Sequence, residues 1–176
     1  MTTPIIRSAT YEDAQSLAAL SIQVWLDTYA VEGLRQEYAE YALSTFTQAY
    51  FTSLLQREEI SIYIAVHQDA IQGYVQANHH SKYHQQDLGF EVEKLYVLSR
   101  FQGLGIGRRL LSHMVEKFGE RYWLYTWVEN KSNRFYEKLG LKLIGKHHFQ
   151  FHHWEIENNV YHAPGIVPLG INQTEP

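Results

Sequence analysis

A glycine-rich turn constrains the fold of this chain more than any other feature of its sequence. Gly103, Gly105 and Gly107 lie in the segment RFQGLGIG at residues 100–107. A predicted strand precedes the turn and a predicted helix follows it. Glycine permits positive φ and close approach to the backbone, and N–H groups at a helix N-terminus attract anions. The segment therefore predicts either a site for a phosphate-bearing ligand or a tight strand-to-helix turn.

Hydrophobic periodicity predicts an α/β (α+β) fold in a single domain at residues 1–162. The predicted strands begin at Ile5 and Ile6 and continue at 61–67, 71–78, 90–97, 123–128, 141–145 and 149–156. Helices are expected after an N-cap at Thr10, at 34–57 with a break that divides it in two, at 106–118, and at 130–139. Residues 79–86 are expected to form a loop and 163–176 a C-terminal tail. The strand–glycine turn–helix–strand unit predicts a parallel, right-handed crossover in a mixed sheet.

Composition and charge exclude several kinds of function for this chain. The net charge of -4 argues against nucleic acid as the main partner and favours a cationic substrate such as an amine, although solubility explains it equally well. The chain has no Cys, so disulfides, thiolate metal sites and a cysteinyl intermediate are excluded. Its ten His residues show no spacing with carboxylates that supports a metal site. Neither a signal peptide nor a membrane-length apolar stretch is apparent, so we expect a cytoplasmic protein without membrane contact.

Two motifs together resemble those of the GNAT superfamily of N-acetyltransferases. The turn fits neither the dinucleotide fingerprint, which needs glycine at Arg108, nor the P-loop, which needs Lys-Ser/Thr after Gly107. Its pattern Arg100-x-x-Gly103-x-Gly105 resembles the acetyl-CoA signature of that superfamily. The segment WVENKSNRFYEKLGL at 127–141 is similar to a second GNAT block, with Leu141 in place of the usual final Phe. The resemblance covers residues 4–160 and implies the GNAT fold: a mixed, mostly antiparallel, twisted sheet of about seven strands flanked by about four helices.

The resemblance implies acetyl-CoA as co-substrate and no metal. The backbone of the strand before the turn would pair with the pantetheine arm, through Leu95, Tyr96 and Val97. The pyrophosphate would be held by the amides of Gln102, Gly103, Leu104, Gly105, Ile106, Gly107 and Arg108. Asn130 and Asn133 would reach the cofactor arm from one face of the next helix. Asn130 is also expected to cap that helix.

The same resemblance assigns catalytic roles. Tyr136 would protonate the departing CoA thiolate, and the alternative is an amphipathic core tyrosine. An amine nucleophile must lose a proton before it attacks, because alkylammonium pKa values are about 10. Glu91 and Glu93, expected on one strand face with Leu95 and Val97, could accept that proton directly or through water; the family string favours Glu93. The alternative is a pair of salt-bridged strand carboxylates.

The acceptor site is expected from the first two helices and the last strands, where Tyr29, Glu37 and Tyr38 are candidates. The segments EKLYV at 93–97 and WLDTY at 25–29 are similar to the PaiA-type polyamine N-acetyltransferases. We therefore expect direct acetyl transfer, in a ternary complex, to a small primary amine such as a polyamine. The alternatives are acetylation of a protein N-terminus or lysine, and a non-catalytic acyl-CoA-binding module. Dimer contacts through the last strands are common in the superfamily, so the resemblance also allows a homodimer.

Overall fold

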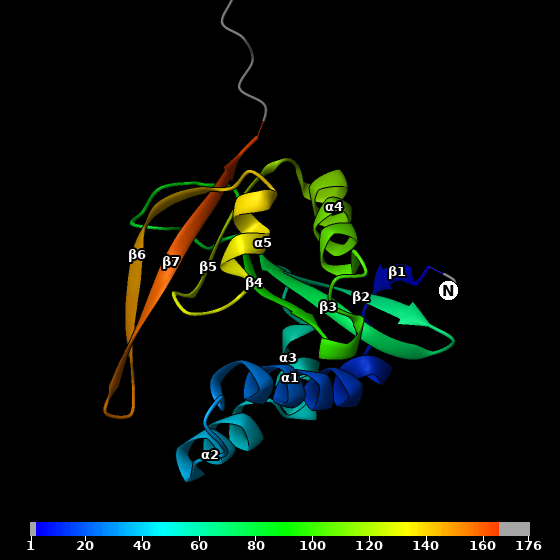
Figure 1. The fold of residues 1–176 in the computed structure, drawn as a ribbon. Helices are drawn as coiled ribbons and strands as arrows, with labels where there is room; N and C mark the ends of the chain where they lie inside the picture. The colour runs from blue at the N-terminus through cyan, green and yellow to red at the C-terminus, as the bar shows by residue number, and fades with distance from the viewer. Residues whose placement is uncertain (1–2, 166–176) are drawn as a thin grey trace, which may run out of the picture.

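The computed structural model describes residues 3–165, which form a seven-stranded sheet in the order β1-β2-β3-β4-β5-β7-β6 (Figure 1). The strands are β1 (Ile5–Ser8), β2 (Ile60–His67), β3 (Ala70–Asn78), β4 (Phe90–Val97), β5 (Arg121–Trp127), β6 (Lys142–Phe151) and β7 (Trp154–Pro164). The helices are α1 (Ala14–Tyr29), α2 (Gln36–Thr45), α3 (Gln48–Leu54), α4 (Ile106–Phe118) and α5 (Asn133–Lys138), with 3-10 turns η1 (Tyr11–Asp13) and η2 (Ser99–Phe101). The mixed, mostly antiparallel sheet of seven strands is confirmed.

Helices cover both faces of the sheet (Figure 1). The helices α1, α2 and α3 lie on one face, where Leu17 of α1 shares a buried cluster with Tyr74 of β3. The helices α4 and α5 lie on the other face, where Leu110 and Met114 share a second cluster with Val75. The four-residue spacing of the apolar residues in α4 places them on one side of the helix, which explains this burial. We call the two sides of the sheet the α1 face and the α4 face.

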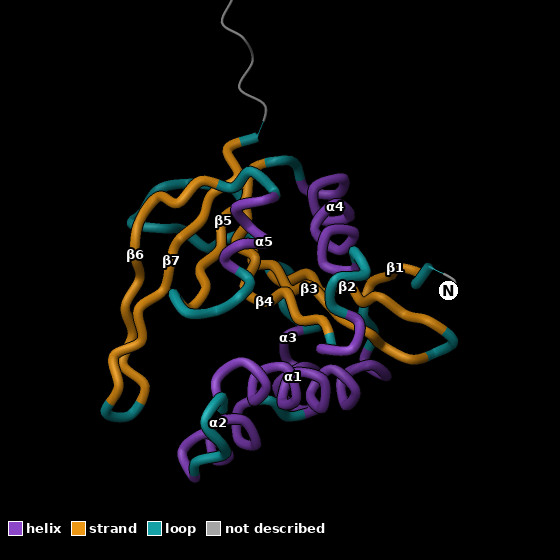
Figure 2. Tube along the Cα trace, viewed as in Figure 1, coloured by secondary structure: helices purple, strands orange, loops and turns teal. Residues whose placement is uncertain are grey.

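The parallel pair of strands, β4 and β5, stays together over only two pairs of residues. Phe90 pairs with Tyr122 and Glu91 with Trp123, and the register ends there. Beyond that point β5 continues to pair with β7 along its whole length. The remainder of β4 therefore has no strand partner on the side turned toward β5, and the two strands diverge (Figure 2).

The strand β4 contains one residue more than the matching stretch of β3. Gln76 pairs with Lys94 and Ala77 pairs with Val92, which leaves Glu93 as a β-bulge. A bulge breaks the strict alternation of faces along a strand, because one residue has no partner opposite.

The bulge corrects one prediction about β4. Leu95 and Val97 contribute to the cluster on the α4 face. Glu91 lies between two residues of that cluster and so points to the α1 face, where Glu93 contacts Gln76. The prediction that both glutamates share a face with Leu95 and Val97 is therefore wrong.

The predicted helical region at 34–57 is divided into α2 and α3, so that residues 3–165 contain five helices rather than about four. Thr47 is the N-cap of α3, and its side chain accepts a hydrogen bond from the N–H of Tyr50 at 3.1 Å. At the start of the chain the N–H of Thr10 donates to the carboxylate of Asp13 at 2.7 Å, in the predicted capping arrangement.

The bounds of the last two strands differ from the prediction. The strand expected at 149–156 contains the turn of a hairpin at His152 and His153, so this prediction is wrong. His152 has a φ of 50°, a left-handed conformation that reverses the chain. The aromatic and histidine side chains continue through this turn, so the hydrophobic pattern gave no sign of it.

The strand β7 also extends into the predicted tail. Ala163 pairs with Tyr122 of β5, and Pro164 is the last residue of the strand. The predicted start of the tail at residue 163 is therefore too early, because Ala163 and Pro164 still belong to the sheet. The part at 166–176 lies outside the described residues.

Candidate active site

The glycine turn ends in the N-terminus of α4. Gly103 and Gly105 have φ values of 78° and 80°, and a Cβ atom at either position would have no neighbouring atom within 4 Å. Gly105 is the N-cap of α4, and the first backbone bond of the helix runs from the N–H of Arg109 to the carbonyl of Gly105 at 3.1 Å. The amides of Ile106, Gly107 and Arg108 therefore precede the first helical hydrogen bond. N–H groups at such a position favour an anionic ligand, so the phosphate site stays a prediction.

Gln102 and Gly107 differ from the other residues of the turn in what they contact. The N–H of Gln102 donates to the carbonyl of Ser99 at 3.2 Å, and its side-chain amide donates to the carbonyl of Val97 at 3.0 Å. A Cβ atom at Gly107 would lie 3.5 Å from Phe135 of α5, which is an ordinary contact distance, so this position faces α5 rather than open space. The predicted phosphate contact of the Gln102 amide is therefore replaced by a bond within the turn.

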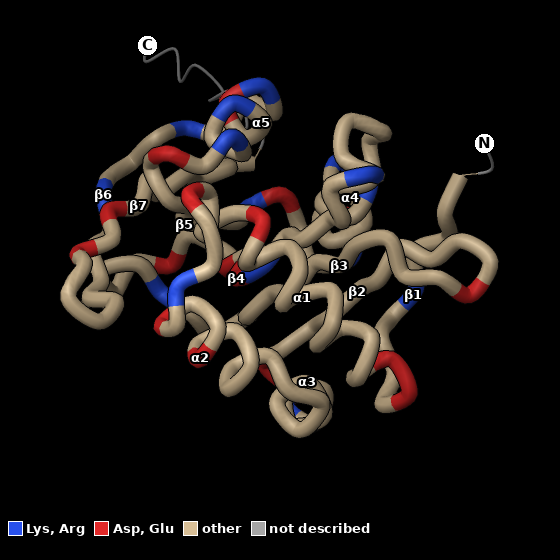
Figure 3. Tube along the Cα trace, turned by 60° about the horizontal axis from the view of Figure 1, so that its bottom comes forward, with Lys and Arg blue, Asp and Glu red and all other residues tan. Residues whose placement is uncertain are grey.

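Basic residues occur along α4 and around α5. Figure 3 shows Lys and Arg on α4 and around α5, among them Arg108 and Arg134 on the helices and Lys131 just before α5. A cationic surface beside a helix N-terminus strengthens the attraction for an anionic ligand.

The diverging part of β4 leads from the acidic residues to the glycine turn. Leu95, Tyr96 and Val97 pair with β3 on one side and have no strand partner on the other. The side chain of Tyr96 packs on the α1 face, where burial raises its pKa well above the ordinary value and keeps the phenol neutral. Backbone groups on this side of the strand are not used by the sheet, so the predicted pairing with an extended ligand stays a prediction.

Tyr136 lies on α5 and reaches the buried cluster of the α4 face. Its side chain is 6% exposed, and its ring lies 5.9 Å from that of Tyr161. Burial is the main cause that raises the pKa of Tyr136 above its ordinary value, so the hydroxyl is protonated at neutral pH. Within residues 3–165 this hydroxyl forms no hydrogen bond. It is thus a protonated donor with no partner of its own in the described chain.

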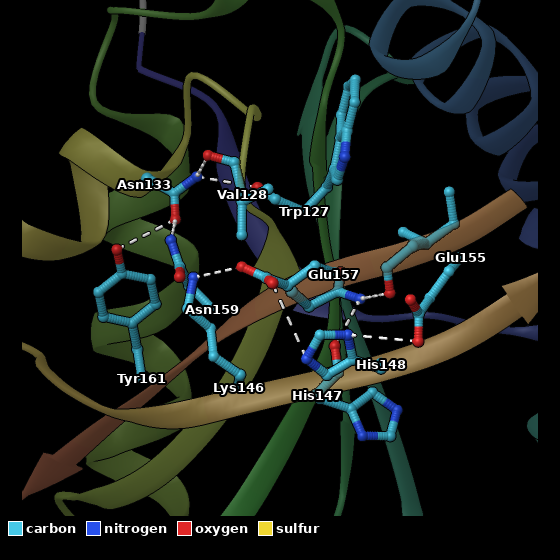
Figure 4. Close-up of polar contacts among 12 residues, drawn as sticks. Trp127, Val128, Asn133, Lys146, His147, His148, Glu155, Glu157, Asn159 and Tyr161 are labelled. Atoms are coloured by element: carbon cyan, nitrogen blue, oxygen red, sulfur yellow. Dashed lines mark hydrogen bonds and ion pairs between the residues drawn. The ribbon is translucent and has the colours of Figure 1, made fainter.

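Asn133 holds the loop between β5 and α5 (Figure 4). Its amide nitrogen donates to three carbonyls of this loop, at Trp127, Val128 and Asn130. Its amide oxygen accepts from Asn159 at 2.8 Å and from the Tyr161 hydroxyl at 3.0 Å. Both ends of the amide are engaged and the residue is buried, so Asn133 fixes the loop rather than presenting a free group to a cofactor arm.

Asn130 lies in the middle of the same loop. The helix α5 begins at Asn133 with Ser132 as N-cap, so the prediction that Asn130 caps the helix is wrong. The Asn130 side chain instead accepts a hydrogen bond from the N–H of Ser132 at 2.9 Å, which stabilises the turn before the helix. Its amide nitrogen has no hydrogen bond in the described part of the chain.

Glu93 and Glu91 lie together on the α1 face. The Glu93 carboxylate accepts hydrogen bonds from the side-chain amides of Gln76 and Asn78. Glu91 is 6% exposed and accepts a hydrogen bond from the hydroxyl of Ser81. Burial, followed by the charge of Glu93, raises the pKa of Glu91, and the Ser81 hydrogen bond partly opposes that rise. The structure therefore brings the two predicted carboxylates together but gives them different surroundings.

Aromatic side chains adjoin these carboxylates on β5. Tyr125 has its pKa raised to about 12, first by burial and then by the charges of Glu91 and Glu93. Trp127, two residues further along β5, lies with its ring 5.5 Å from that of Tyr29 at the end of α1. The α1 face thus combines negative charge with aromatic rings.

The predicted acceptor residues are partly brought together. The rings of Tyr29 and Tyr38 both contact the ring of Trp25, with centroids 4.9 and 5.8 Å away. The ring centroid of Tyr38 also lies 5.9 Å from that of Trp154 of β7. Burial raises the pKa of Tyr29 to about 12. Glu37 has no hydrogen bond or ion pair to these aromatic residues within the described range.

Sequence analysis missed several residues of this site. Gln76 and Asn78 are polar residues at every second position of a strand, a signal that could have identified a polar stripe on the sheet. Tyr125 and Trp127 follow the same period on β5. Ser81 gave no such signal, because its contact depends on how the loop after β3 folds back.

Comparison with known proteins defines the class of the domain. Residues 58–142, which include the acidic residues, the glycine turn and α5, match the family model of the acetyltransferase (GNAT) domain. This part of the chain is similar to the GNAT acetyltransferase domain, and the GNAT fold expected from the two motifs is confirmed.

Particular relatives agree with this class. An uncharacterized N-acetyltransferase in the pepI 3' region of Lactobacillus delbrueckii subsp. lactis is 22% identical over 145 residues, which is 78% of this chain and 84% of the relative. The PaiA N-acetyltransferase of Thermoplasma acidophilum, solved in complex with coenzyme A, superposes with a TM-score of 0.71 at 16% identity, over 90% of this chain and 98% of that one. A ribosomal-protein-alanine N-acetyltransferase of Brucella melitensis superposes with a TM-score of 0.63 at 19% identity, over 90% and 98% of the two chains. At these identities the superpositions establish a shared fold.

Two further findings concern membranes and metals. No helix within residues 3–165 has both the length and the apolar character needed to span a bilayer. In the same range no three His, Asp or Glu side chains are grouped so that they could hold a metal ion.

Proposed function

We propose that this protein transfers the acetyl group of acetyl-CoA to a primary amine. The observation that carries this proposal is the diverging end of β4, which has unpaired backbone groups between the amides of α4 and the residues of the α1 face. Tyr136 approaches from the α4 face, whereas Glu91 and Glu93 lie on the α1 face. A thioester placed along this edge would have a proton donor on one side and a proton acceptor on the other.

The chemistry follows from these positions. Bound acetyl-CoA supplies an activated acyl group and a thiolate leaving group. Glu93 accepts a proton from the substrate ammonium, directly or through water, which frees the nitrogen lone pair for attack on the acyl carbon. As the carbon–sulfur bond breaks, the Tyr136 hydroxyl donates its proton to the sulfur. A backbone N–H near Val97 would stabilise the oxyanion.

We infer that the acceptor is a small cationic amine, such as a polyamine. Glu91 and Glu93 offer carboxylate acceptors, and the buried side-chain oxygen of Gln76 has no hydrogen-bond partner in the described chain. Tyr125 and Trp127 adjoin them, and aromatic faces attract alkylammonium groups. An ammonium with three N–H donors matches this set of acceptors and rings. Acetylation of a protein N-terminus or lysine is the second candidate, and the fold shared with the ribosomal-protein-alanine enzyme supports it.

Cofactor binding is tested by replacing one glycine. Gly105→Leu forces a side chain into the left-handed position and into the open space beside the α4 amides, and we expect no measurable binding of CoA by calorimetry. Gly119 terminates the same helix, also has positive φ, and has no atom within 4 Å of its Cβ position. Gly119→Leu therefore carries at least as much backbone strain far from the turn and should bind CoA normally. Tight binding by the Gly105 variant would exclude the phosphate site.

The acceptor is tested with a panel of amines. Release of free thiol from acetyl-CoA is measured with spermidine, shorter diamines, monoamines and peptides with a free N-terminus or lysine. Turnover that is highest for the polyamines supports the proposed substrate class, and turnover with peptides alone favours the second candidate. If CoA binds but no amine is acetylated, the domain is a non-catalytic acyl-CoA-binding module and the proposal is wrong.

A further inference from the structure

The loop that joins β3 to β4, residues 79–89, reaches past β5 and β7 to the edge strand β6 (Figure 2). Within it the hydroxyl of Tyr83 donates to the carbonyl of Lys146 at 3.3 Å. The Tyr83 ring also lies 5.7 Å from the ring of Trp123, the residue that pairs with Glu91. The loop therefore passes over the end of β4 that carries the acidic residues.

A glycine on β6 provides the space for Tyr83. A Cβ atom at Gly145 would lie 2.5 Å from the Tyr83 hydroxyl oxygen, whereas the nearest ring carbon would be at 3.5 Å, an ordinary contact. Only the hydroxyl conflicts with a larger residue at this position. We call the contact of Tyr83 with Gly145 and Lys146 the Tyr83 latch.

The same loop supplies a hydrogen bond to the acidic pair. Ser81 lies two residues before Tyr83, and its hydroxyl donates to the carboxylate of Glu91. The charged and titratable groups that act on Glu91 or sense its charge are Glu93 and Lys94 on β4 and Tyr125 on β5. Ser81 is the neutral hydrogen-bond donor that the loop adds to this set.

We propose that Ser81 and Tyr83 are positioning residues for the acidic pair. The Tyr83 latch fixes the loop on β6, the fixed loop keeps Ser81 on Glu91, and Glu91 is thereby oriented and shielded from water beside Glu93. This inference rests on the proposed function and adds to it a loop that controls the acceptor side of the reaction. Cofactor binding, on the other side of β4, is independent of the loop.

The Tyr83 latch is tested by a double-mutant cycle. Gly145→Ala displaces the Tyr83 hydroxyl, and we expect kcat/KM for the amine to fall about tenfold while KM for acetyl-CoA stays unchanged. Tyr83→Phe removes the conflicting atom and keeps the ring on Trp123, so a change of about twofold is expected. In the Tyr83→Phe background Gly145→Ala should cost almost nothing further. An equal loss in both backgrounds would overturn the latch.

The role of Ser81 is tested without any substrate. The titration of Glu91 is followed by NMR in protein carrying ¹³C at the glutamate carboxyl groups, with the Glu91 signal assigned from Glu91→Gln. Ser81→Ala removes a hydrogen bond that favours the carboxylate, so the pKa of Glu91 should rise, and Ser81→Thr should restore it. An unchanged titration in Ser81→Ala contradicts the proposal. Because this measurement needs no turnover, it decides the role of the loop even if no amine is acetylated and the proposed function fails.

Discussion

Glu93, the extra residue of β4, accepts a hydrogen bond from the side-chain amide of Gln76 on β3. Alternation from Val92 places Glu93 on the α1 face, and Gln76, assisted by Asn78, fixes the orientation of its carboxylate there. The bulge at Glu93 returns Leu95 and Val97 to the α4 face, where they pack on the second cluster. One irregularity in a strand thus separates the acidic residues from the part of β4 that faces the proposed cofactor.

Replacing Glu93 tests its role as base. We expect Glu93→Gln to lower kcat/KM for the amine by about 10²-fold at neutral pH, because the substrate ammonium loses its proton acceptor. The loss should shrink toward pH 9, where a larger fraction of an amine with a pKa of about 10 is already deprotonated. The measurement is a pH series of steady-state rates with CoA affinity as control. A loss that stays constant with pH would assign Glu93 a structural role.

Replacing Tyr136 tests the proton donor. Tyr136→Phe should lower kcat by about 10²-fold, the usual contribution of a general acid, and leave CoA affinity unchanged. Its thermal midpoint should stay close to that of the parent protein, since the hydroxyl has no hydrogen-bond partner in the described chain to leave unpaired. Tyr122→Phe is the matched control, because Tyr122 is also a buried tyrosine of the α4 face. If both variants behave alike, Tyr136 is a core residue only.

Replacing Asn133 tests the loop network. Asn133→Ala removes the donor to three carbonyls and the acceptor for Asn159 and Tyr161, and we expect the free energy of unfolding to fall by about 3 kcal/mol. Asn130→Ala removes a single hydrogen bond to Ser132 and should cost about 1 kcal/mol. Urea unfolding measures both. Equal losses would show that Asn133 is no more important to the loop than Asn130.

The pH dependence of stability tests the burial of Glu91. Its pKa in the folded protein is raised above the ordinary value of 4.5, so the native state binds the proton more tightly than the unfolded state. Stability from this group is present below pH 4.5 and is lost as pH rises through the folded pKa. Glu91→Gln lacks this titration and should therefore gain stability relative to the parent protein between pH 4 and pH 7.

A second glutamate provides the control for this series. The pKa of Glu157 is lowered, first by its hydrogen bond from Lys146, so its contribution has the opposite sign and is lost as pH falls. Glu157→Gln should therefore lose stability relative to the parent protein over the same rise in pH. If the stability of Glu91→Gln relative to the parent protein changes with pH in the same direction as that of Glu157→Gln, burial does not destabilise the ionised carboxylate of Glu91.

Much of the fold could be predicted because it is encoded locally. The apolar spacing of residues 106–118 identified α4, and the glycines before it identified its N-terminus. Boundaries failed where local patterns continue across a change of structure. The hairpin turn at His152 and His153 has the same aromatic and histidine composition as its strands, and the turn at Asn130 ends in a helix three residues later than the motif suggested.

The sequence alone determined the order of elements, the glycine turn at Gly103 and Gly105 before α4, and the short helix that carries Tyr136. Periodicity and turn chemistry act over a few residues, so they can be recognised without the rest of the chain. Only the tertiary structure decided that Glu93 is a bulge, that Asn133 is occupied by the loop, and that Ser81 lies on Glu91. These properties depend on strand register and on contacts between distant segments, which no local pattern records.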